Sequence, residues 1–86
     1  MDTENVPLSL LRPGERAHVV DLALNGLLRR RILDLGIVPG TALTCIGRAP
    51  AGDPIAYLVR GTVIALRSED AIGIRVNPSL DKNMLG

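Results

Sequence analysis

The stretch of residues 29–40 most limits how this chain can fold: three arginines, then Ile-Leu-Asp-Leu-Gly-Ile-Val-Pro-Gly. Apolar residues at helical spacing form one stripe before and within it: Leu24, Leu28, Ile32 and Leu35. Gly36 suits the left-handed position just after a helix, and Pro39-Gly40 is a turn signal that we expect to need a positive φ at Gly40. The pattern predicts a helix over residues 26–35, a stop at Gly36, and a turn that leads into a strand.

The rest of the chain has the composition of short strands separated by glycine- and proline-containing turns. The expected strands are residues 16–22, 41–47, 55–59, 62–66 and 72–76, with a short helical turn at 68–71. Five short strands in a chain of 86 residues predict a small barrel, which removes exposed sheet edges. The helix is then inserted between the first and second strands.

Length predicts one domain, bounded by loose ends. We expect a flexible leader at residues 1–7, a folded domain at 8–76 and a mobile C-terminal tail at 77–86. The N-terminus lacks a basic region followed by an apolar one, and no apolar run approaches the length of a membrane span. A cytoplasmic protein without membrane insertion is the expectation.

Composition argues against nucleic-acid binding. The chain has no Phe or Trp, a single Tyr57, and a formal net charge of +1. Single-stranded nucleic acids are usually bound by stacking on aromatic rings, and nucleic-acid binders are usually strongly basic.

Candidate catalytic and metal-binding groups are few. No G-x-x-x-x-G-K-[ST] loop is present, and no Ser or Cys has a recognisable His partner. His18 and Cys45 lie too far apart in sequence to form a ligand cluster, and Cys45 stands in an apolar run that predicts burial. Asp53 is interpreted as a turn residue that bonds to nearby backbone. We therefore expect no enzyme activity, no metal site and no cofactor.

Four segments resemble the FeoA family, the small cytosolic component of bacterial ferrous-iron uptake. They are residues 8–15 (Leu-Ser-Leu-Leu-Arg-Pro-Gly-Glu), 31–41 (Arg-Ile-Leu-Asp-Leu-Gly-Ile-Val-Pro-Gly-Thr), 49–55 (Ala-Pro-Ala-Gly-Asp-Pro-Ile), and Gly61 with 64–67 and 69–71. The resemblance covers roughly residues 8–76. It implies an SH3-like barrel with a helical insertion, and a regulatory adaptor that assists FeoB, the membrane transporter with a cytosolic GTPase domain.

The predicted helix and the turn after it are the candidate docking surface for such a partner. Neighbouring helical residues diverge by about 100°, so the three arginines cannot form one patch. Arg31 is expected at the edge of the apolar stripe, and Leu33 on the side opposite it. The residues chosen for partner binding are Leu27, Arg30, Ile32 and Leu33. Those expected to shape turns are Gly36, Pro39, Gly40, Gly52, Asp53 and Pro54.

Two other interpretations stay open at this point. One is a free-standing metal- or anion-sensing module, like the same barrel at the C-terminus of some metal-dependent repressors. The weaker one is a small RNA-binding barrel, which the near-neutral charge disfavours. Self-association on the helix surface is also compatible with the pattern.

Overall fold

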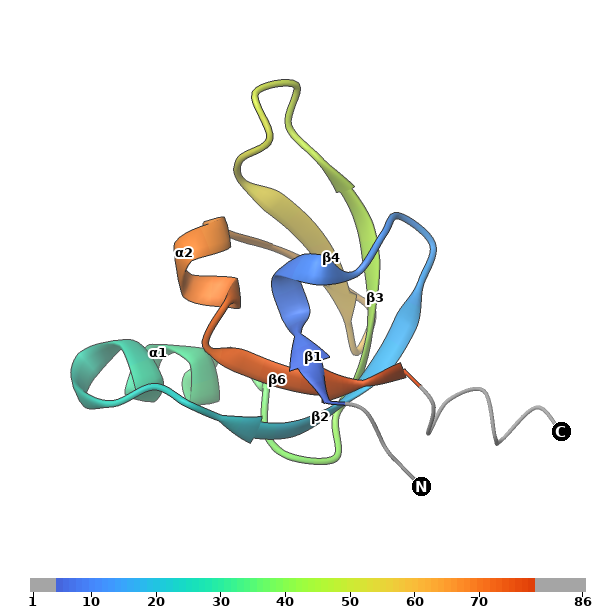
Figure 1. The fold of residues 1–86 in the computed structure, drawn as a ribbon. Helices are drawn as coiled ribbons and strands as arrows, with labels where there is room; N and C mark the ends of the chain where they lie inside the picture. The colour runs from blue at the N-terminus through green and yellow to red at the C-terminus, as the bar shows by residue number, and fades with distance from the viewer. Residues whose placement is uncertain (1–4, 79–86) are drawn as a thin grey trace, which may run out of the picture.

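Six antiparallel strands form one sheet in the order β1-β6-β2-β3-β4-β5. The structure is a computed structural model that describes residues 5–78, and Figure 1 shows its path. The strands are β1 (Val6–Pro7), β2 (Arg16–Leu22), β3 (Ala42–Arg48), β4 (Ile55–Val59), β5 (Thr62–Leu66) and β6 (Ile74–Asn77). The helical segments are the 3-10 helix η1 (Leu8–Leu10), α1 (Gly26–Asp34) and α2 (Ser68–Ala71).

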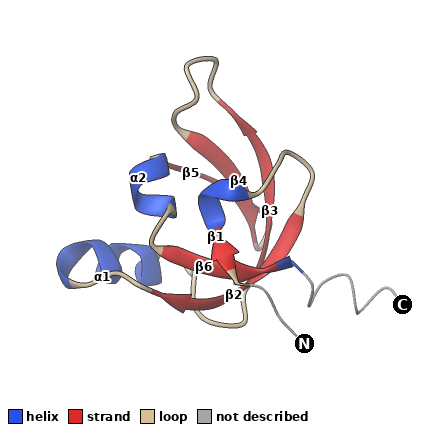
Figure 2. Cartoon of the chain, viewed as in Figure 1, coloured by secondary structure: helices blue, strands red, loops and turns tan. Residues whose placement is uncertain are grey.

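The sheet curls into a barrel-like shape but does not close, since β1 and β5 stand at its two ends and do not pair with each other. The predicted mainly-β fold with a helix between the first two long strands is confirmed, because α1 connects β2 to β3. Figure 2 shows α1 at one end of the molecule, next to the end of β2.

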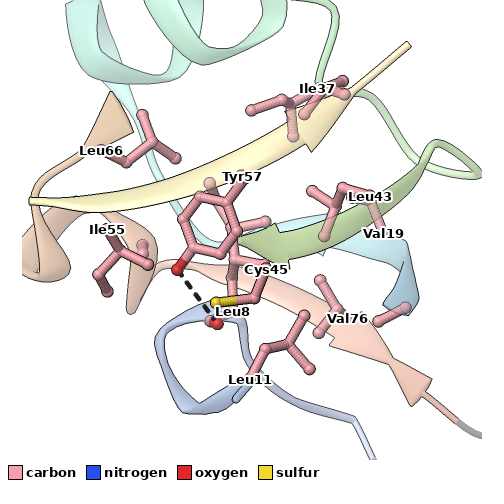
Figure 3. Packing of buried hydrophobic residues seen from close by; sticks show 14 of the residues in the cluster. Leu8, Leu11, Val19, Ile37, Leu43, Cys45, Ile55, Tyr57, Leu66 and Val76 are labelled. Carbon is pink, nitrogen blue, oxygen red and sulfur yellow. Dashed lines mark hydrogen bonds between the residues drawn. The ribbon is translucent and has the colours of Figure 1, made fainter. Parts of the chain in front are cut away.

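The core lies inside the curled sheet and is almost entirely aliphatic. Alternate residues of the strands face inward, so the register places buried Cys45 of β3 beside buried Tyr57 of β4. Tyr57 is the only aromatic residue, and its hydroxyl donates a hydrogen bond of 3.3 Å to the carbonyl oxygen of Leu8 (Figure 3). This bond ties η1 to the sheet, where Leu8 and Leu11 are also buried.

Both ends of the folded region differ from the expected boundaries. Val6 and Pro7 pair with Val76 and Arg75 of β6, so part of the expected leader is a strand. Asn77, expected in the mobile tail, belongs to β6 and is buried. A two-residue strand has no periodicity of its own, which is why the sequence pattern missed β1. Residues 1–4 and 79–86 of these two segments lie outside the described residues.

Gly73 sets the close approach between the start of β6 and the segment that leads into α1. The amide of Ala23 donates to the Gly73 carbonyl oxygen at 2.7 Å. A Cβ at Gly73 would run into the Leu24 side chain, with Cγ at 3.0 Å, and would lie 3.2 Å from the Ala23 carbonyl oxygen.

Gly73→Ala should therefore lower the free energy of unfolding by about 1–3 kcal/mol, because Leu24 and the backbone at Ala23 must shift. Urea denaturation followed by circular dichroism measures the effect. Gly47→Ala is the matched control, since nothing lies within 4 Å of a Cβ there. Equal stability of the two variants would contradict this packing.

The buried thiol and phenol also predict how stability depends on pH. Desolvation raises the pKa of Cys45 above its ordinary 9.0 and the pKa of Tyr57 well above its ordinary 10.0. A group whose pKa is higher in the folded chain than in the unfolded chain contributes its full stabilisation below the unfolded-state pKa. This contribution is lost as the pH rises through the folded-state pKa. Stability should begin to fall above pH 9.0. Tyrosinate absorbance of the single tyrosine should appear together with loss of the far-ultraviolet dichroism; ionisation in a still-folded chain would refute the prediction.

Candidate partner-binding surface

Helix α1 begins at Gly26, directly after Asn25 at the N-cap position. Asn25 has extended backbone angles, with φ −144° and ψ 174°, as an N-cap residue should, but its side chain makes no capping hydrogen bond. The amide of Arg29 donates to the Asn25 carbonyl oxygen at 3.5 Å. The helix therefore starts where the sequence predicted, without a side-chain cap.

One side of α1 attaches it to the core. Ile32 is only 1% exposed, and Leu24 and Leu28 pack against the core beside it. Leu35 was expected in the same stripe, yet 38% of it is exposed. The helix ends at Asp34, and Ile37 fills the core instead of Leu35.

The four residues chosen for partner binding do not share one environment. Leu27 is 88% exposed, the highest value among the exposed large apolar residues within residues 5–78, and Arg30 is also exposed. Leu33 is half-buried, so it offers less surface than a residue opposite the core would. Ile32 is buried in the core, so its side chain is not accessible to a partner and is removed from the surface. Arg31 is exposed as well.

The end of α1 has the hydrogen bonds of a Schellman motif. The Ile37 amide donates to the Ile32 carbonyl oxygen at 3.3 Å, and the Gly36 amide donates to the Leu33 carbonyl oxygen at 2.9 Å. Gly36 has a φ of +93°, which side chains with a Cβ rarely adopt. A glycine at this position lets the chain leave the helix sharply.

The turn that follows is organised around the buried hydroxyl of Thr41. The Val38 amide donates to Thr41 Oγ1 at 3.2 Å, and the hydroxyl donates to the Gly36 carbonyl oxygen at 3.3 Å. Gly40, with a φ of +92°, donates its amide to the Val19 carbonyl oxygen at 2.7 Å, and Val19 donates to the Thr41 carbonyl oxygen at 2.9 Å. The turn is thus fastened to β2, with Pro39 exposed at its tip.

Asp53 does not bond to its local backbone as expected. Its carboxylate accepts hydrogen bonds from the Ser68 amide at 2.8 Å and from the Ser68 hydroxyl at 3.1 Å, at the start of α2. The pairing of Ile55 with Leu66 explains this, because continuing the same register places residue 53 opposite residue 68. Gly52 has a φ of +96° and Pro54 is exposed beside it. Asp53 therefore joins two segments of the fold.

Sequence reasoning missed a second exposed surface, the outer face of β3, β4 and β5. Cross-strand pairing aligns Thr44, Leu58 and Val63 on this face, and Ala56 with Ala65. A register shift near Ile46 leaves that side chain exposed above a shallow groove of about 380 Å³ lined mainly by apolar residues. Both faces of β4 and β5 are apolar in sequence, which was the available signal.

The described residues offer little reactive chemistry. Among residues 5–78, no group of three or more His, Cys, Asp or Glu side chains could hold a metal ion. Burial keeps the Cys45 thiol protonated by raising its pKa, and a protonated thiol is a poor nucleophile. None of the helices described in residues 5–78 is long and apolar enough to cross a membrane.

Thr41→Val should lower the free energy of unfolding by about 1–3 kcal/mol, because the Val38 amide and the Gly36 carbonyl lose their shared partner. Thermal unfolding monitored by circular dichroism is the measurement. Thr44→Val, on the outer face of the sheet, is the control and should change stability by no more than about 0.5 kcal/mol. If Thr41→Val is as stable as the control, the hydroxyl does not organise the turn.

Comparison with known proteins agrees with this fold. A family model described as "FeoA domain" matches residues 6–78. A Fe(2+) transport protein A/Fe(2+) transporter FeoB fusion protein of Porphyromonas gingivalis is 39% identical over 69 residues, which are 80% of this chain but only 8% of that protein.

Two solved structures are similar over most of their length. The FeoA-like protein of Clostridium acetobutylicum is 36% identical, with a TM-score of 0.79 over 88% of this chain and 87% of the other. The FeoA of Stenotrophomonas maltophilia, solved with zinc and described as an SH3 domain protein, is 29% identical, with a TM-score of 0.74 over 84% and 89%. With its family match, its sequence similarity and its SH3-like sheet, this chain belongs to the FeoA family.

Proposed function

We propose that this chain is a non-enzymatic accessory protein of ferrous iron uptake that docks on the cytosolic part of a FeoB-type transporter. The observation that carries the proposal is the Porphyromonas gingivalis relative, in which an FeoA part and an FeoB part belong to one polypeptide. Fusion keeps two modules at a high effective concentration, which favours modules that work together. Such docking would place this chain in the cytoplasm.

Helix α1 and the turn after it are the surface we assign to this contact. Leu27 projects from the first turn of the helix, and 88% of it is exposed. A large apolar side chain in this position suits a pocket on a partner. Arg30 is exposed on the same helix, and its guanidinium can bind a carboxylate through two parallel hydrogen bonds. Half-buried Leu33 would contribute a smaller contact.

The rigidity of the helix attachment supports a regulatory role. Ile32 anchors α1 in the core, and the Thr41 hydroxyl fixes the turn after it. A surface held in one orientation binds with less loss of conformational freedom than a mobile one. Docking would regulate transport if α1 binds one conformation or nucleotide state of the transporter more tightly than another, because a ligand shifts an equilibrium only by such a difference.

Leu27→Asp should weaken binding to the transporter's purified cytosolic part by about tenfold or more, because it places a charge in an apolar contact. Isothermal titration calorimetry with the full chain gives the dissociation constant. Leu10→Asp is the matched control, since Leu10 is also an exposed apolar residue but lies on η1.

Two results would overturn the assignment. Unchanged affinity of the Leu27→Asp chain would remove α1 from the contact, and absence of binding by the wild-type chain would remove the docking function. A parallel titration with Fe(II) addresses the sensing alternative, for which a tight stoichiometric site in this chain would be required.

A further inference from the structure

Strand β5 is an open edge of the sheet. It is the last strand in the order, and among the strands of residues 5–78 it pairs only with β4. Its sequence, Thr-Val-Ile-Ala-Leu, has no charge and no proline, although such residues commonly protect edge strands from pairing. Val63 is 62% exposed on this strand. No residue of this edge strand therefore hinders pairing with another strand.

The hairpin geometry decides which backbone groups of β5 face outward. Arg60 and Gly61 connect β4 to β5 with φ of 52° and 80°, the pattern of a two-residue type I′ turn. Val59 and Thr62 close this turn as a hydrogen-bonded pair, and such pairs alternate along an antiparallel ladder. Thr62, Ile64 and Leu66 thus bond to β4. The amides and carbonyls of Val63 and Ala65 point away from the sheet.

These outward groups complement themselves. If a second copy lies antiparallel with a two-fold axis at Ile64, Val63 of each chain stands opposite Ala65 of the other. Each such pair can exchange two backbone hydrogen bonds, as in any antiparallel ladder. Ile64 then faces its own counterpart, so the contact is isologous and closes after two chains. We propose that this chain forms a homodimer in which the β5 strands of two copies pair in this register.

The charges beside β5 favour a second copy as the occupant. No charged side chains face each other across the two paired strands, because Thr62–Leu66 contains none. Beyond the strand ends, the Arg60 turn of one copy comes beside the first turn of α2 in the other, which carries Glu69 and Asp70. Arg67 lies between the strand and these two acidic residues, and their combined negative charge exceeds its positive charge. Both ends of the dimer thus bring a basic turn to an acidic one.

The contact uses residues other than the α1 residues proposed for the transporter, so its failure leaves the docking proposal standing.

The first test is the mass of the full chain at rising concentration, measured by sedimentation equilibrium. The wild type should approach twice the monomer mass. Val63→Lys should stay monomeric, because it places a cation beside the pairing groups of the other copy. Leu10→Lys is the matched control, since Leu10 is 64% exposed and Val63 62%, and it should dimerise like the wild type.

A disulfide tests the register. Ile64→Cys should form a covalent dimer under mild oxidation, because directly opposed residues have Cβ atoms about 5 Å apart. Thr62→Cys should not, since its counterpart would lie four residues along the partner strand, about 14 Å away, beyond the roughly 7 Å limit for Cα atoms in a disulfide. Circular dichroism checks that both variants fold, and the native Cys45 is buried.

A wild-type chain that stays monomeric overturns the proposal, even if an unrelated extended peptide binds to β5. A Val63→Lys dimer as stable as the wild type also overturns it. Equal cross-linking of the Thr62→Cys and Ile64→Cys chains would refute the register at Ile64.

Discussion

The hydroxyl of Thr41 joins the end of helix α1 to the sheet by accepting from the Val38 amide and donating to the Gly36 carbonyl. The Thr41 carbonyl oxygen also accepts a hydrogen bond from the Val19 amide, which links the turn to β2. The same residue therefore closes the turn and begins the return into β3. Ile32 and Ile37 enter the core on either side of Gly36, whose carbonyl the Thr41 hydroxyl holds, so the orientation of α1 follows from these contacts. Leu27 is exposed as a consequence of that orientation.

Several polar groups of this chain have structural roles. The Tyr57 hydroxyl holds η1, and the Asp53 carboxylate holds the start of α2. Cys45 is buried as a protonated thiol. The exposed apolar side chains include Leu27 on α1 and Val63 on β5, beside the largely apolar outer face of β3, β4 and β5. These exposed apolar groups are the ones that we propose for contacts with a transporter and with a second copy.

Local sequence was sufficient for most of the strands. Glycine and proline separate the segments clearly, so β2, β4 and β5 have the residues that the pattern predicted. Strand β3 is shifted by one residue, and β6 begins at Ile74, two residues later than predicted. The helix stop at Gly36 and the positive φ at Gly40 also followed from local rules.

Long-range contacts account for what was missed. The Asp53–Ser68 contact follows from the pairing of β4 with β5, and β1 exists only because β6 lies beside it. The exposures of Leu27, Leu33 and Leu35 depend on how Ile37 fills the core beyond the helix end. A projection of the helix alone has no information about that residue.

We propose that α1 and its turn form the contact with a FeoB-type transporter. Backbone amide spectra of the labelled chain, recorded with and without the transporter's cytosolic part, test it residue by residue. We expect the changed amides to cluster in residues 26–41 and those of η1 and β1 to be unaffected. Changes confined to the outer face of β3, β4 and β5, with α1 unaltered, would contradict it.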